Sequence, residues 1–217
     1  MKVLVRGQEI EIEPNSRPYF LKRLLADGFD IALIFMAFVV LTLLLMKTPL
    51  AATYNGHQAR YKAIQEAALA EFDGDQTAAA AALKENQEYQ EALFAANLHA
   101  YLLKALACFL VEAVILLIVP LIRKDRATPG KILTGVLPFN ERRQTRATRV
   151  QILSRFLFVF FIDSLGWYLF AEILTFLLIP VFRIVEMLVN KKHKTICDAV
   201  TGVMIIEKAS YDGLDQI

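Results

Sequence analysis

Apolar residues gather in three long stretches of this chain, and polar segments separate them. The stretches cover residues 29–46, 106–122 and 156–189; the first two hold one charged residue each and the third holds four. Apolar runs of about 18 residues or more with so few charges are typical of helices that cross a membrane. The pattern predicts an integral membrane protein and excludes a soluble enzyme, a secreted disulfide scaffold and a disordered chain.

The segments around the first two stretches predict long helices. A first helix is expected over residues 19–46 and a second over residues 58–72. Residues 75–119 contain neither proline nor glycine, so they are predicted to form one helix of about 45 residues, roughly 65 Å long. A membrane needs only about 30 Å, so half of this helix is expected to project outside and pair with residues 58–72 in a helical hairpin. The apolar stripes of the two arms either pack on each other or form a docking surface for a partner.

The third apolar stretch, residues 156–189, has basic residues on both sides, which requires an even number of crossings. Gly166 and Pro180 offer breaks, so two short helices in a hairpin are expected there.

The predicted fold is an all-α integral membrane protein with four transmembrane helices, the last two forming a short or re-entrant hairpin. The expected order is a cytoplasmic β-hairpin (1–16), the first membrane helix (17–48), an acidic extracytoplasmic helical hairpin (49–100), the second membrane helix (101–122), a basic cytoplasmic loop with strands (123–155), the third and fourth membrane helices (156–189) and a cytoplasmic tail with a strand (190–217).

Three short segments outside the apolar stretches predict strands. Val3 and Val5, then Ile10 and Ile12, recur at every second position around Arg6-Gly7-Gln8, which indicates a β-hairpin and not a cleavable signal peptide. Residues 132–139 and 199–206 are rich in valine, isoleucine, leucine and threonine. Together the three segments are expected to form a small cytoplasmic sheet.

Charge is distributed unevenly, although the net charge is only +2 in a chain with 56% hydrophobic residues. Residues 123–155 hold nine basic and two acidic side chains, whereas residues 51–100 hold three basic and seven acidic ones. Because basic loops stay on the cytoplasmic side, we expect residues 123–155 and both termini to be cytoplasmic and residues 51–100 to lie outside. Four arginines of the basic loop are expected to meet anionic phospholipids, and no motif indicates nucleic-acid binding: Arg142, Arg143, Arg146 and Arg149.

Charged residues at membrane depth are the candidate functional groups, because each is costly unless it is paired or hydrated. Arg23, Asp27 and Asp30 share one face of the first helix, and Glu112 and Asp163 lie inside later stretches. In one interpretation these groups pair and lock the helices together, with Arg23 bound to Asp27 or Asp30. In the other interpretation, Asp30, Glu112 and Asp163 converge on a water-filled pathway and bind protons or small cations. A further pair, Arg183 and Glu186, is spaced for mutual neutralisation.

Other kinds of site have little support in the sequence. The three histidines and two cysteines show no metal-binding spacing. The T-P-G-K segment at residues 128–131 lacks the first glycine of a phosphate loop. We therefore expect no enzyme activity, no metal and no cofactor.

Three motifs in order resemble the RDD family of small bacterial membrane proteins. The first is Arg23 with Asp30 seven residues later, the second is the T-P-G-K segment, and the third is a tail at residues 194–206 that contains Asp198. The tail departs from the family pattern, since Cys197 stands where a histidine is usual. The resemblance implies a bacterial inner-membrane protein, adds Asp198 to the candidate residues and suggests transport only in general terms.

Two functions remain open from the sequence. The first is transport of protons or monovalent cations, with Asp30 as the ion-binding carboxylate and a homo-oligomer forming the pathway. The second is a non-catalytic scaffold or accessory subunit of a larger membrane complex that docks through the hairpin at residues 51–100. Essential residues would lie at membrane depth in the first case and at the two ends of the molecule in the second.

Overall fold

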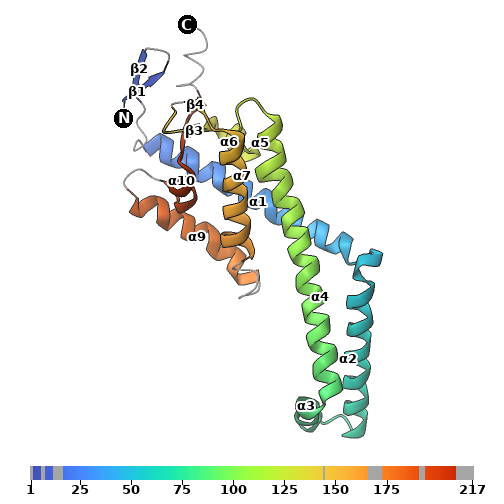
Figure 1. Cartoon of the computed structure of the whole chain (residues 1–217). Coiled ribbons are helices and arrows are strands. Elements are labelled where there is room, and N and C mark those ends of the chain that lie inside the picture. The colour runs from blue at the N-terminus through green and yellow to red at the C-terminus, as the bar shows by residue number, and fades with distance from the viewer. Residues whose placement is uncertain are drawn as a thin grey trace. The chain divides into compact units, whose positions relative to one another are not determined.

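The computed structural model describes residues 2–5, 8–11, 17–143, 145–165, 173–190 and 194–208, and these residues are mostly helical (Figure 1). Within this described part of the chain, two helices are long and apolar enough to cross a membrane, Phe20–Leu45 and Gln87–Ile122. The chain divides into two compact units. One comprises Met1–Ala37 with Cys108–Ile217, and the other comprises Phe38–Ala107.

The elements follow one another along the chain as shown in Figure 1. The helices are α1 (Arg17–Leu45), η1 (Pro49–Ala51), α2 (Ala52–Glu71), α3 (Gln76–Glu85), α4 (Gln87–Glu112), η2 (Ala113–Ile118), α5 (Val119–Ile122), α6 (Pro129–Thr134), α7 (Arg149–Phe158), η3 (Val159–Leu165), α9 (Ile173–Val189) and α10 (Ile196–Thr201). The strands are β1 (Lys2–Val5), β2 (Gln8–Glu11), β3 (Val136–Asn140), β4 (Thr145–Arg146) and β5 (Val203–Glu207).

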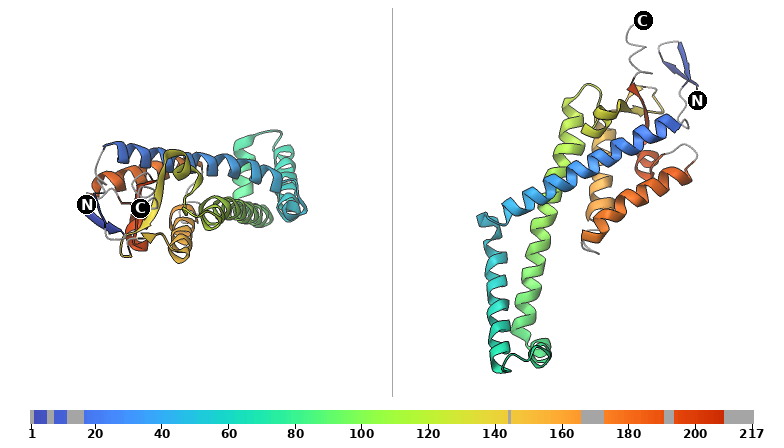
Figure 2. Two further views of the ribbon diagram at one scale, coloured as in Figure 1. Left: turned by 90° about the horizontal axis from the view of Figure 1, so that it is seen from above. Right: turned by 180° about the vertical axis from the view of Figure 1, so that it is seen from behind.

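The unit Phe38–Ala107 is a helical hairpin in which α2 and the first part of α4 lie side by side, with α3 at the turn (Figures 1 and 2). The prediction of one unbroken helix over residues 75–119 is wrong, because the chain turns at Asn86. The Asn86 backbone is extended, with φ −78° and ψ 104°, and its side-chain oxygen accepts the N–H of Tyr89 at 2.9 Å. Asparagine is favoured at such helix starts because its side chain satisfies a free N–H group.

The other unit contains a three-stranded antiparallel sheet with strand order β4-β3-β5. All five residues of β3 are buried, and its register with β5 runs from Val136 opposite Glu207 to Asn140 opposite Val203. Strands β1 and β2 form a hairpin, as predicted, but they make a separate two-stranded sheet. The single sheet expected from all three segments is therefore wrong.

Two strands are shorter than predicted, because the first residues of each predicted strand belong to a helix. Residues 132–134 end α6 and residues 199–201 end α10, and only the residues after each helix form strands. Gly135 and Gly202 close the two helices with left-handed backbones, at φ 69° and φ 64°. Glycine adopts this conformation at low cost, so it permits the switch from helix to strand.

The apolar stretches contain irregular helical turns. The π-helical segment η2 interrupts the helix ahead of Pro120, and η3 continues α7 as a second π-helical segment. Helix α9 passes through Pro180 without a break, so the break predicted at Pro180 is wrong. Proline is tolerated in apolar helices where other groups bond the freed carbonyl. The other predicted break, at Gly166, lies outside the described residues.

A small core holds the site in place in the unit formed by Met1–Ala37 and Cys108–Ile217. The core consists of Ala26 on α1, Val136 on β3, Ala147 between β4 and α7, Ile152 on α7, and Val203 and Ile205 on β5. Two leucines, Leu117 and Leu121, pack against it. Helix α7 also packs against η2, α5 and α10. Helix α6 packs against β3, so the core and the elements packed on it bring α1, α6, α7 and α10 together around the charged side chains described next.

Candidate functional site

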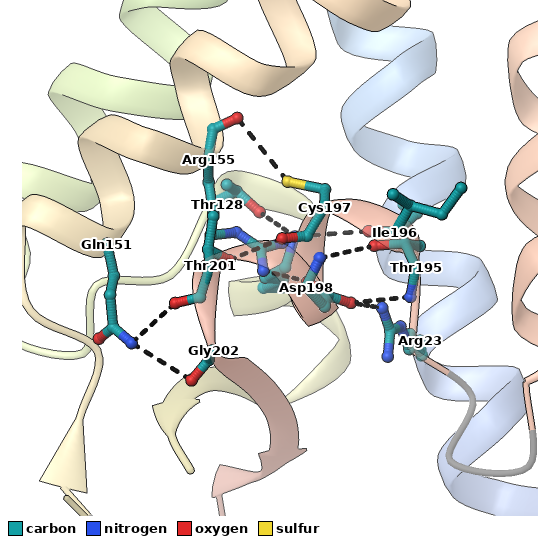
Figure 3. Close-up of polar contacts among 12 residues, drawn as sticks. Arg23, Thr128, Gln151, Arg155, Thr195, Ile196, Cys197, Asp198, Thr201 and Gly202 are labelled. Carbon is teal, nitrogen blue, oxygen red and sulfur yellow. Dashed lines mark hydrogen bonds and ion pairs between the residues drawn. The ribbon is translucent and has the colours of Figure 1, made fainter. Parts of the chain in front are cut away.

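Asp198 ties three helices together in the candidate site. Its carboxylate is fully buried on α10 and accepts hydrogen bonds from Arg23 on α1 and Arg155 on α7 (Figure 3). Thr195 and Asp198 form a capping box at the start of α10, since each backbone N–H donates to the other side chain at 3.2 Å. Asp198 thus serves both the local helix and two distant arginines.

The ionisation of this cluster follows from its charges. Burial alone would raise the pKa of the Asp198 carboxyl, but Arg155 and Arg23 outweigh burial and hold that pKa well below its usual range. Burial likewise acts against the charge of Arg155, but Asp198 raises the pKa of the guanidinium. Asp198 and Arg155 are therefore both charged at neutral pH.

Asp30 joins α1 to the start of α6. One carboxylate oxygen accepts the hydroxyl of Thr128, and the other accepts the N–H of Gly130 at 2.7 Å. Helix α6 approaches α1 so closely that a Cβ atom on Gly130 would lie 2.1 Å from the carbonyl oxygen of Ala26. Only glycine fits this contact, which explains the glycine of the T-P-G-K segment.

Lys131 is a buried cation among three oxygen atoms. Its Nζ lies 3.4 Å from Asp27 Oδ1, 3.4 Å from Asp30 Oδ2 and 3.2 Å from Thr128 Oγ1. Two carboxylates of α1 thus share one ammonium group of α6. The 3.4 Å separations exceed the 2.7–2.9 Å typical of tight charge-assisted hydrogen bonds.

A cavity of about 70 Å³ adjoins these groups, which is room for a small number of water molecules. Glu112, buried on α4 at the start of η2, reaches the same cavity. The wall combines apolar residues with eight charged ones: Arg23, Asp27, Asp30, Glu112, Arg126, Lys131, Arg155 and Arg183.

The sequence model of the RDD family matches residues 17–202, which is most of the chain. The chain belongs to the RDD family. No match was found among curated proteins or among solved structures. The RDD match confirms the resemblance drawn from Arg23, Asp30 and Asp198. In this RDD chain, Arg23 bonds directly to Asp198, and Asp30 lines the cavity that Arg23 also lines.

The structure brings together most of the residues selected from the sequence of this RDD chain. Arg23, Asp27, Asp30 and Glu112 line one cavity, and Asp198 contacts Arg23. The side chain of Asp163, the third carboxylate expected to converge there, lies outside the described residues.

The predicted partner of Arg23 was an aspartate of its own helix, whereas its hydrogen bond shown in Figure 3 goes to Asp198, 175 residues away. Arg183 lines the cavity, and Glu186 accepts the N–H of Ile196 at 3.3 Å.

Three side chains of the candidate site were not predicted from the sequence: Thr128, Lys131 and Arg155. The T-P-G-K segment served as a family motif and was rejected as a phosphate loop, but neither Thr128 nor Lys131 was predicted to belong to the site. Arg155 was counted only as a basic flank. Among the described residues, no group of three or more histidine, cysteine or acidic side chains is arranged to hold a metal ion.

Proposed function

We propose that this RDD-family chain transports protons or small monovalent cations across a bacterial inner membrane, with Asp27 and Asp30 as the ion-binding carboxylates. One observation carries the proposal: the Lys131 ammonium lies between Asp27, Asp30 and Thr128 oxygens at 3.2–3.4 Å. Three oxygens that accommodate a monovalent ammonium group offer the ligands that a proton or a small metal cation also needs.

The loose geometry around Lys131 supports exchange at this position. At 3.4 Å, the carboxylates of Asp27 and Asp30 hold the ammonium less tightly than a short ion pair would. Carboxylates at membrane depth are costly and commonly mark ion pathways. The adjoining cavity, with Glu112 in its wall, offers space for water beside the carboxylates.

The proposed arrangement in the membrane follows the charge pattern. Residues 123–155 and both termini are taken as cytoplasmic, residues 51–100 as extracytoplasmic, and residues 156–189 as crossing twice. The exposed basic residues of the cytoplasmic loop would meet anionic lipid headgroups. Because four helices make a thin wall for a pathway, we infer a homo-oligomer.

The test is ion flux into liposomes that contain the purified full chain. Asp27→Asn is the sharpest variant, because Asp30 also holds Thr128 and Gly130 and its loss would disturb α6. We expect Asp27→Asn to abolish most of the proton or Na⁺ flux, because an amide at this position cannot carry the charge that binds the ion, while the protein still inserts and folds. Glu71→Gln, at an exposed carboxylate of α2, is the matched control and should transport normally. If a folded Asp27→Asn variant transports ions as fast as the wild type, the proposal is wrong.

A second candidate function is an accessory subunit that docks through the hairpin. Two observations favour it: Phe38–Ala107 is a compact unit of its own, and Phe94 on its α4 arm is 70% exposed. In that case the purified chain would carry a stoichiometric foreign subunit and would show no flux with or without Asp27. Mass determination by light scattering, followed by mass spectrometry of any companion, separates this result from a homo-oligomer.

A further inference from the structure

Two histidines face each other across the helical hairpin of the unit Phe38–Ala107. His57 lies on α2 and His99 on α4, with ring centroids 5.3 Å apart and ring planes at 30°. Both side chains are half-buried. The chain has only three histidines, and the fold brings two of them into contact.

One of the two rings has a defined tautomer. His99 Nδ1 lies 2.8 Å from the carbonyl oxygen of Ala95. Because a carbonyl only accepts, Nδ1 carries the hydrogen in the neutral ring and Nε2 keeps its lone pair. Histidines that bind metals in proteins usually donate their other ring N–H to a carbonyl or carboxylate in this way.

The spacing of the rings also suits a shared metal ion. Two imidazoles bound to one ion at about 2.0–2.1 Å, with a tetrahedral angle between them, have ring centres roughly 5 Å apart. His57 and His99 already have this separation. Rotating the His57 ring about its broad terminal torsion would therefore direct one of its nitrogens toward a common point with His99 Nε2, while His99 keeps its contact with the Ala95 carbonyl.

Other contacts between the arms hold this arrangement. Arg60 on α2 pairs with Glu88 on α4 at 2.9 Å, and the rings of Tyr61 and Tyr89 meet edge to face at 6.2 Å. These contacts link the same two arms without either histidine. The imidazole pair is therefore positioned before any ion arrives.

We propose that His57 and His99 form a binding site for a divalent transition metal ion such as Cu²⁺, Ni²⁺ or Zn²⁺. Imidazole nitrogens select these ions over Mg²⁺ and Ca²⁺, which need oxygen ligands. Residues 53–61 and 95–103 contain no aspartate, glutamate or cysteine, so water completes the coordination shell. The acidic balance of residues 51–100, with seven acidic and three basic side chains, raises the local concentration of divalent cations.

The experiment uses the full chain without an affinity tag, purified in detergent and treated with a chelator. Cu²⁺ is titrated while the electron paramagnetic resonance spectrum is recorded. We expect one ion per chain with two nitrogen ligands. His57→Gln and His99→Gln should each weaken binding by roughly tenfold or more. His193→Gln, at the third histidine, is the matched control and should bind like the wild type.

A second measurement needs no variant. On addition of Zn²⁺, the imidazole NMR signals of two histidines should shift together while the third stays in place. The proposal is overturned if the wild type binds no ion stoichiometrically, if the two glutamine variants bind as the wild type does, or if Zn²⁺ shifts no pair of signals. The outcome is independent of the transport proposal, because neither histidine lines the charged cavity.

Discussion

Asp198 shows how a single buried carboxylate connects three helices of this RDD protein, α1, α7 and α10. It is fully buried and binds two arginines that come from different helices. Arg23 itself is only 1% exposed. Removing one partner of a buried ion pair leaves an uncompensated charge, which costs more than the pair itself contributes.

We predict that Asp198→Asn lowers the free energy of unfolding by about 3–5 kcal/mol, because Arg23 and Arg155 lose their shared counter-charge. The matched control is Asp125→Asn. Asp125 pairs with the exposed Arg123 at 2.9 Å, and such surface pairs contribute about 1 kcal/mol or less. Denaturant titration of both variants in detergent measures the difference. Equal losses in the two variants would contradict a special role for Asp198.

The same residue predicts a pH dependence. The pKa of Asp198 in the folded protein lies below its value in the unfolded chain, which is about 3.9. The stabilisation that ionised Asp198 gives to the folded protein is therefore complete above roughly pH 4–5. It is lost as the pH falls further toward the folded-state pKa of this carboxyl. Unfolding free energies from pH 6 down to pH 3 should fall less steeply for Asp198→Asn than for the wild type.

At the scale of elements, the contact between α1 and α6 builds the proposed ion site. Asp30 reaches the Gly130 N–H because α6 lies against the Ala26 carbonyl. That contact keeps Lys131 beside Asp27 and Asp30. The spacing between the two helices therefore controls the geometry around the ammonium group.

Gly130→Ala is expected to destabilise the protein by about 1–3 kcal/mol, as overpacking does elsewhere, because the new Cβ would lie 2.1 Å from the Ala26 carbonyl oxygen. Gly28→Ala on α1 is the control, since nothing lies within 4 Å of its Cβ position. Thermal unfolding of both variants in detergent tests this. A Gly130→Ala variant as stable as Gly28→Ala would show that α6 does not pack so closely on α1.

At the scale of the whole molecule, the proposed orientation has a direct test. Cysteines placed at exposed positions 66 and 143 should report opposite sides of the membrane, and the native Cys108 and Cys197 are both buried. We expect a membrane-impermeant maleimide to label Glu66→Cys in intact cells and Arg143→Cys only after the membrane is opened. Labelling of both from one side, or the reverse pattern, would contradict the orientation inferred from charge.

Much of the fold and of the candidate site was visible in the sequence, because it depends on local pattern. Apolar runs indicated the two candidate membrane helices, and spacing placed Arg23, Asp27 and Asp30 on one helix face. The family motifs added Asp198. The break at Asn86 was missed because a capping asparagine carries a weaker signal than proline or glycine.

What the sequence by itself determined was therefore the two long apolar helices, the asymmetry of charge and the charged residues that needed explanation, since burying a charge is costly wherever it lies. The tertiary structure alone decided the partners. Lys131 meets Asp30 across 101 positions, and Arg23 meets Asp198 across 175. It also decided that residues 132–134 form a helix, because Asp30 anchors the start of α6 from another helix. Such contacts depend on how helices pack, and no local pattern of residues encodes the pairing of distant segments.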